Sequence, residues 1–113
     1  MGRIRAFPLS ASGVVGGTSG SATSNYAVTI HSMILTETGG TTNETLTFYT
    51  AAAAPNQLQP AAPSASGTEQ FEVIVPKGTT LVVNDIGGHG LYFPDGLYVA
   101  ASGGTLSGVI AIS

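Results

Sequence analysis

Two histidines and two aspartates are the side chains of this sequence whose chemistry suits proton transfer or metal binding. Asp85 and His89 lie four positions apart across a Gly-Gly connection, so their side chains can meet. A metal site needs a third protein ligand, and Asp95 is the candidate for it. We favour a simpler interpretation, in which both aspartates bond to turn backbone, His89 is solvated and His31 points outward from a strand. We therefore expect no metal site and no cofactor.

The motifs of common hydrolases and phosphate-binding sites are missing. No Gly-x-Ser-x-Gly motif follows a strand and opens a helix, as an α/β-hydrolase nucleophile requires. Glu69 and Glu72 are three apart on a predicted strand, so they face opposite sides and cannot flank one glycosidic bond. The glycine clusters lack the lysine and the helix of a phosphate-binding loop. We predict that the protein is not an enzyme.

Four tyrosines are candidates for contacts with a sugar or with another protein. Exposed tyrosines on a sheet can stack on sugar rings or pack against another protein. In a small sandwich they more often line the edge of the core, with the phenol at the surface. We favour a place in the core or in a subunit interface over sugar binding for Tyr26, Tyr49, Tyr92 and Tyr98.

The low charge of the chain limits its partners. Charged residues make up 8% of the 113 residues, against about 25% in ordinary soluble domains. The basic residues Arg3, Arg5 and Lys77 form no stripe and the net charge is −3, so we expect no binding to nucleic acid. There is no apolar run long enough for a membrane helix, no signal-peptide pattern and no cysteine. A low charge fits either a protein inside an assembly, where neighbours cover its surface, or a secreted polar β protein, and we favour the assembly.

The elements that carry these residues are predicted to be short strands. Apolar and polar residues alternate with a period of two, and glycine or proline follows about every ten residues. No segment has the pattern of an amphipathic helix. This organisation predicts an all-β fold, an antiparallel β-sandwich or jelly-roll-like domain with about seven strands at 26–36, 44–50, 69–75, 79–85, 91–93, 97–101 and 105–112.

The first of these strands is expected to bury one face. A strict alternation places Val28, Ile30, Ser32 and Ile34 on one side and Ala27, Thr29, His31 and Met33 on the other.

Two segments are predicted to lie outside the sandwich. Residues 1–25 are rich in Gly, Ser, Thr and Ala, so we expect a flexible N-terminal arm, either a disordered leader or a segment that a partner orders, with the sandwich at 26–113. Residues 51–67 carry three prolines and are expected to form an extended surface loop. The proposed partner contacts are Arg3, Arg5, Phe7, Leu9, Val14, Val15, Pro55, Leu58 and Pro60.

The order of these features resembles the small β-sandwich virion proteins of tailed bacteriophages, of the capsid decoration or cement type. The resemblance covers about three quarters of the chain. It rests on the alternating strand at 28–36, the strand ending in Phe48-Tyr49, the segment from Phe71 to Gly78, and the Gly-Leu-Tyr-Phe-Pro-Asp-Gly-Leu-Tyr-Val block at 90–99, followed by Gly103-Gly104. The loop at 51–67 is longer than such proteins lead us to expect. The proteins that the chain resembles have no catalytic residues, so the resemblance implies none here.

The resemblance implies a structural function. The expected protein decorates or cements a bacteriophage capsid through contacts with the major capsid protein or other virion subunits, and is a homo-oligomer, with a trimer favoured. It would be made in the host cytoplasm and end on the capsid surface. The alternative is a carbohydrate-binding or host-recognition β module on a phage tail structure.

Overall fold

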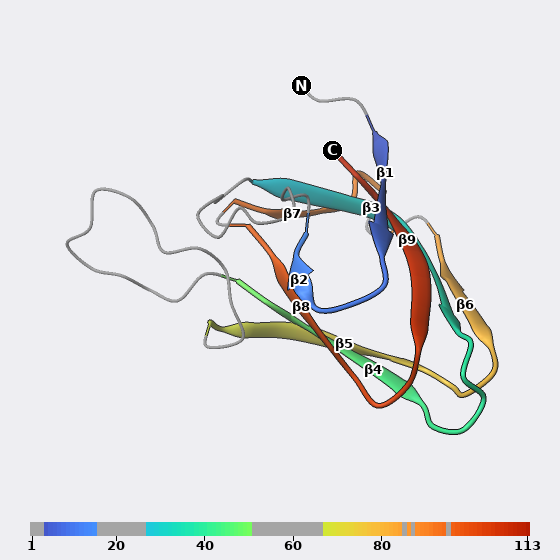
Figure 1. Ribbon diagram of the computed structural model, residues 1–113. Helices are drawn as coiled ribbons and strands as arrows, with labels where there is room; N and C mark the ends of the chain where they lie inside the picture. Colours follow the sequence, from blue (N-terminus) through green and yellow to red (C-terminus); the bar gives the residue numbers. More distant parts are fainter. Residues whose placement is uncertain (1–3, 16–26, 51–66, 85, 87, 95) are drawn as a thin grey trace.

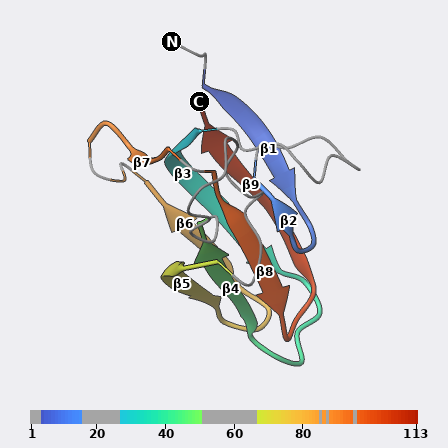
Figure 2. The same ribbon diagram turned by 90° about the vertical axis from the view of Figure 1, so that its left-hand side faces the viewer.

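The protein is described by a computed structural model for residues 4–15, 27–50, 67–84, 86, 88–94 and 96–113, apart from the side chain of Val14. Two antiparallel sheets pack face to face and enclose one apolar core. Figures 1 and 2 show the sheets as separate layers, with β3 and β9 in one and β4 and β8 in the other. The predicted all-β sandwich is confirmed.

The first layer, sheet A, has its strands in the order β1-β9-β3-β6, and β7 pairs with β3 beside this path. All neighbouring strands in it are antiparallel. The central strand β3 contacts β6, β7 and β9, so it organises the sheet. The strands of sheet A are β1 (Arg5–Leu9), β3 (Val28–Glu37), β6 (Thr80–Val83), β7 (Leu91–Phe93) and β9 (Leu106–Ile112).

The second layer, sheet B, has the order β2-β8-β4-β5 and is also antiparallel. Its inward residues Leu46 and Phe48 are fully buried, whereas Thr47 between them faces outward, as the alternation predicts. The strands of sheet B are β2 (Gly13–Val14), β4 (Glu44–Tyr49), β5 (Glu69–Val75) and β8 (Tyr98–Ser102).

Aromatic rings join the two sheets within the core. The rings of Phe48 and Phe71 stack with centroids 4.4 Å apart, and Phe71 lies 6.1 Å from Phe93 on β7. This cluster therefore connects two strands of sheet B with one of sheet A. Buried aromatic rings remove large apolar areas from water, which is the main source of stability for a domain of this size.

A β-bulge in β3 overturns part of the predicted alternation. The pairing of β3 with β9 shifts register between Ile30 and Ser32. Val28 and Ile30 face the core before the shift, and Met33 and Leu35 face it afterwards. The expectation that Ser32 and Ile34 share the buried side with Val28 is therefore wrong. A bulge inserts one extra residue, and that residue reverses the side on which every later side chain lies.

The N-terminal segment corrects a second expectation. Residues 5–9 form β1, and all five of them pair with β9. Gly13 and Val14 pair with β8. Leu9 and Val15 are 3% and 1% exposed and belong to the core. Residues 4–15 are therefore part of the sandwich and not an arm. Pro8 is compatible with β1 because an edge strand leaves one side of its backbone unpaired.

At one end of the sandwich, three connections cross from one sheet to the other. They lie beside Glu37, the last residue of β3. They are the turns from β3 to β4, from β5 to β6 and from β8 to β9, and Figure 1 shows all three at the same end. The predicted loop at 51–67 lies outside the described residues, except for Gly67.

Candidate functional site

The structure separates the residues that could have supported metal or acid–base chemistry. His31 is half-buried at the bulge, and its Nε2 lies 2.8 Å from the hydroxyl of Ser113. His89 is exposed in the connection before β7. Asp85 and Asp95 lie outside the described residues. Among the described residues, no group of three or more His, Asp or Glu side chains is placed to hold a metal ion.

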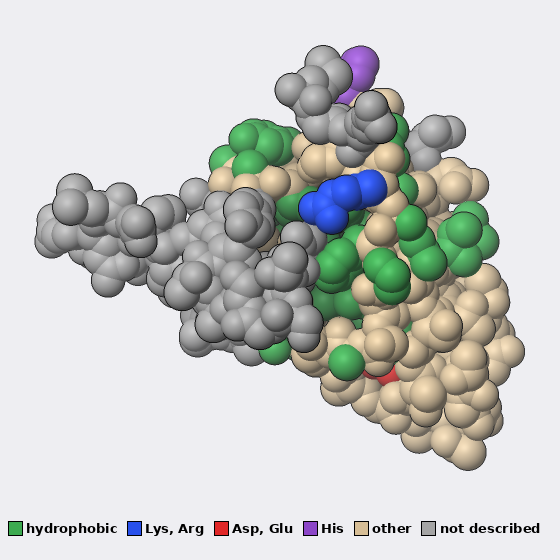
Figure 3. Space-filling view, turned by 45° about the horizontal axis from the view of Figure 1, so that its top comes forward, with side chains coloured by type: hydrophobic (Ala, Val, Ile, Leu, Met, Phe, Trp, Pro, Cys, Tyr) green, Lys and Arg blue, Asp and Glu red, His purple; other side chains and the backbone are tan. Residues whose placement is uncertain are grey.

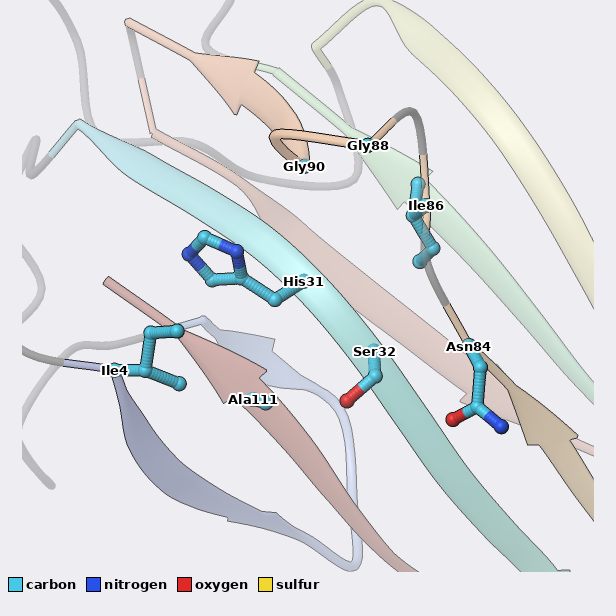
Figure 4. Close-up of a pocket in the computed structure, with 8 residues that line it drawn as sticks. All are labelled: Ile4, His31, Ser32, Asn84, Ile86, Gly88, Gly90 and Ala111. Atoms are coloured by element: carbon cyan, nitrogen blue, oxygen red, sulfur yellow. The ribbon is translucent and has the colours of Figure 1, made fainter.

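A shallow hollow of about 450 Å³ opens beside His31. Figure 4 shows that its walls come from β3, β9, the segment before β1 and the connection between β6 and β7. His31 is the one titratable side chain among the described lining residues, which otherwise offer Ser32, Asn84, two glycines and apolar groups. The hollow can accept a hydrogen-bonding group from a partner, and its described lining residues include no second titratable group to exchange a proton with His31.

A single carboxylate fastens the three turns at one end of the sandwich. Glu37 ends β3 and is 1% exposed. Its oxygens accept hydrogen bonds from the backbone N–H of Gly39 at 2.9 Å, of Gly40 at 2.7 Å, of Gly78 at 2.8 Å and of Thr105 at 2.9 Å. These four donors belong to three separate turns. They stabilise the ionised form, with Thr105 contributing most, and lower the pKa of Glu37 to about 2.

A second buried carboxyl lies close by with poorer partners. Glu44 is 1% exposed, and its Oε2 accepts a hydrogen bond from the N–H of Gly104 at 3.1 Å. Its Oε1 has no hydrogen-bond partner among the described residues. Burial raises the pKa of Glu44, and the negative charge of Glu37 adds to that rise. Glu44 also lines a surface hollow with Ser10 and Ser12. The spacing of Glu37 and Glu44 in the sequence gave no sign of their joint burial.

The outer face of sheet A carries a continuous row of apolar side chains. Pro8, Val109, Ile34 and Val82 are direct neighbours across β1, β9, β3 and β6. Val109 is 41% exposed, Ile34 51% and Val82 52%. We refer to these four residues as the apolar row. It crosses the whole sheet at right angles to the strands, so it is a ridge of the tertiary structure and not of any one segment.

The rows on either side of the apolar row are small or polar and carry no charge. One contains Ser107, Thr36 and Thr80, and the hydroxyls of Thr36 and Thr80 lie 2.9 Å apart. The other contains Ala6, Ala111 and Ser32. The ten side chains of the three rows are all uncharged at any pH near neutrality. We call these three rows together the A face.

The outer face of sheet B has a different composition. Its outward residues include Thr45, Thr47 and Glu72, with Ile74 as an isolated apolar residue that is 51% exposed. Tyr49 and Tyr98 are cross-strand neighbours on this face and are half-buried. On the side of the molecule that Figure 3 displays, hydrophobic side chains of the described residues lie at several places and charged side chains cover small areas.

The residues predicted to contact partners are placed as follows. Phe7 packs against the core, Leu9 and Val15 lie within it, and the backbone of Val14 pairs in β2. Arg5 is exposed at the start of β1. Because Leu9 and Val15 are buried by their own chain, they offer no surface to a neighbour. The remaining positions, outside the described residues, are Arg3, Pro55, Leu58 and Pro60.

Sequence reasoning missed the A face because no pattern in the sequence marks the bulge in β3, and the bulge is what turns Ile34 outward. Of the tyrosines, Tyr92 on β7 is 64% exposed, Tyr49 and Tyr98 are half-buried, and Tyr26 lies outside the described residues. The sequence signal that could have revealed the A face was the presence of two apolar residues, Val82 and Val109, each at an outward position of a predicted strand. The described residues include no helical segment with the length and apolar character that crossing a membrane requires.

Comparisons with protein-family models, with curated proteins and with solved structures gave no match to this chain.

Proposed function

We propose that this protein is a non-catalytic structural subunit of a bacteriophage virion, which decorates or cements the capsid through protein–protein contacts. The observation that carries the proposal is the A face, where an uncharged apolar row spans four strands. Exposed apolar patches on soluble domains commonly mark interaction sites. Depletion of charge is also the compositional mark of the core of a protein interface.

The rigid frame of the domain suits this role. Glu37 ties three turns together, and the core joins the two sheets through the contact between the rings of Phe71 and Phe93. A subunit that presents a flat surface held by such a frame loses little conformational entropy on docking. Several copies on a shell would add their contacts through avidity. Capsid and other virion subunits are the proposed partners, and the assembled particle is the proposed location.

The direct test is protein mass spectrometry of purified virions from a phage whose genome encodes this chain. We expect its peptides at a copy number comparable with that of the major shell protein, and we expect them to remain after washing at high salt, because apolar contacts are not screened. Detection in the lysate but not in the purified particles would contradict the proposal.

A second candidate function rests on Tyr49 and Tyr98. These residues are neighbours on the outer face of sheet B and could offer two rings to a sugar. A glycan array probed with the purified protein tests this function. Binding that disappears in Tyr98→Ala would favour a host-recognition module on a tail structure, whereas an array without signal would remove it.

A further inference from the structure

We propose that the A face binds a second copy of this chain, so that two sandwiches stack through their A sheets in a twofold-symmetric dimer. The inference rests on the proposed structural function and names another copy of this subunit as the virion partner of the A face, so that contacts with the capsid would use other surfaces of the dimer. It can be tested separately from the virion assignment, because self-association is measured on the purified chain alone.

Charge is the first argument for a second copy. Each chain carries a net charge of −3, so repulsion opposes an interface that brings the carboxylates of two copies together. The three rows of the A face contain no ionisable side chain, so apposing two such faces buries no charge and creates no like-charge contact. Glu72, by contrast, stands on the outer face of sheet B.

The shape of the apolar row is the second argument. The row runs from Pro8 on one edge strand to Val82 on the other, with Val109 and Ile34 at its centre. A twofold axis in the plane of the interface brings the row of one copy onto the row of the other, whether the axis runs along the strands or across them. An isologous interface requires such a self-complementary surface.

The size of the A face sets the expected strength of the dimer. Four strands about 4.8 Å apart and three rows of side chains about 6.6 Å apart span a flat area of about 400 Å². Standard protein interfaces bury about 800 Å² on each partner. The A face has about half of that area, so we expect a weak dimer that forms at high protein concentration. Stacked sheets pack about 10 Å apart, a spacing that side chains of this size can fill.

Two lysine substitutions test the interface. Ile34 and Ile74 are each 51% exposed on a strand, but only Ile34 belongs to the A face. In sedimentation or light scattering over a concentration series, we expect wild type and Ile74→Lys to reach the mass of two 11.3 kDa chains. We expect Ile34→Lys to weaken dimerisation about 30-fold or more, the effect of a central hot-spot residue.

A cross-linking experiment tests the same contact without placing a charge in it. The chain contains no cysteine, so Ile34→Cys and Ile74→Cys each create a single thiol. A short bifunctional maleimide should join two copies of Ile34→Cys and leave Ile74→Cys as single chains. Circular dichroism of each variant verifies that it is folded.

The possible outcomes separate the two proposals. A monomeric wild type at high concentration, a trimer, or a dimer that Ile34→Lys leaves intact would each overturn the dimer. A monomer that is nevertheless found in purified virions would leave the structural function standing. A dimer through the A face that is absent from virions would leave the dimer standing and remove the virion assignment.

Discussion

Ile34 and Ile74 each leave 51% of their surface exposed, on opposite outer faces of the same sandwich. Their equal exposure makes them a matched pair, because a change at either position should affect the isolated chain alike. Substituting either one with lysine should alter the free energy of unfolding of the monomer by about 0.5 kcal/mol or less, as is usual for surface positions. A difference between them should appear only where chains associate.

That difference predicts how thermal stability depends on protein concentration. Dimerisation stabilises the folded state by mass action, so the Tm of a dimer rises with concentration. We expect such a rise for wild type and for Ile74→Lys but a much smaller rise for Ile34→Lys, measured by calorimetry over a hundredfold range of concentration. Equal slopes for the two variants would contradict the assignment of the A face.

Opposite effects are expected from neutralising the two buried carboxylates. Glu37→Gln loses the charge that four backbone N–H groups bind and turns an amide N–H toward donors, so we expect a clear fall in Tm at pH 7. Glu44→Gln removes a charge that burial disfavours, so we expect an unchanged or higher Tm. Thermal unfolding at pH 7 measures both, and a fall of similar size in the Tm of the two variants would argue against the distinct roles given to them.

The same carboxylates predict how stability depends on pH. The pKa of Glu37 is lowered from 4.5 to about 2, so between these values the unfolded chain binds more protons. Its contribution is therefore full above pH 4.5 and is lost as the pH falls toward 2. The raised pKa of Glu44 has the opposite sign, so its contribution is present at low pH and is lost as the pH rises through the raised value.

Urea unfolding from pH 2 to pH 7 resolves these two contributions. We expect the loss of stability of wild type below pH 4.5 to be smaller in Glu37→Gln. Glu44→Gln should keep that loss and should gain stability, relative to wild type, toward pH 7. If Glu37→Gln and wild type lose the same amount of stability below pH 4.5, groups other than Glu37 cause that loss.

Two turn glycines that both have a positive φ predict different costs of substitution. Gly40 has φ 77° with open space where a Cβ would lie, whereas Gly103 has φ 104° with the carbonyl oxygen of Asn43 in that place. Gly40→Ala should cost about 1 kcal/mol from backbone strain alone. Gly103→Ala adds a clash with backbone and should cost about 2–4 kcal/mol. Thermal unfolding of both variants checks the order, and a larger loss for Gly40→Ala would contradict it.

Removing the N-terminal strands should destabilise the whole sandwich. Deletion of residues 1–15 takes β1 and β2 from the two sheets and removes Leu9 and Val15 from the core. Burial of two such side chains contributes about 3–6 kcal/mol, a large share of the stability of a small domain. Deletion of residues 1–3 is the control. Chemical unfolding should show a lost or strongly weakened transition for the longer deletion, and equal midpoints for the two would restore the idea of an arm.

The sequence determined the class of the fold and the places of most strands. Alternation in 44–50 and 69–75 set which residues face the core, because a strand with one buried face has a period of two. Glycine and proline between the strands marked the turns. These signals are local, so they are readable without knowledge of the partners of each strand.

Only the tertiary structure decided the candidate site. Pro8, Val109, Ile34 and Val82 lie on four strands far apart in the chain, and strand order and register bring them into one row. The bulge after Ile30 decides that Ile34 faces outward. Glu37 meets donors from three turns only once those turns share one end of the sandwich. Pairing, register and crossover are non-local, so no pattern within one segment contains them.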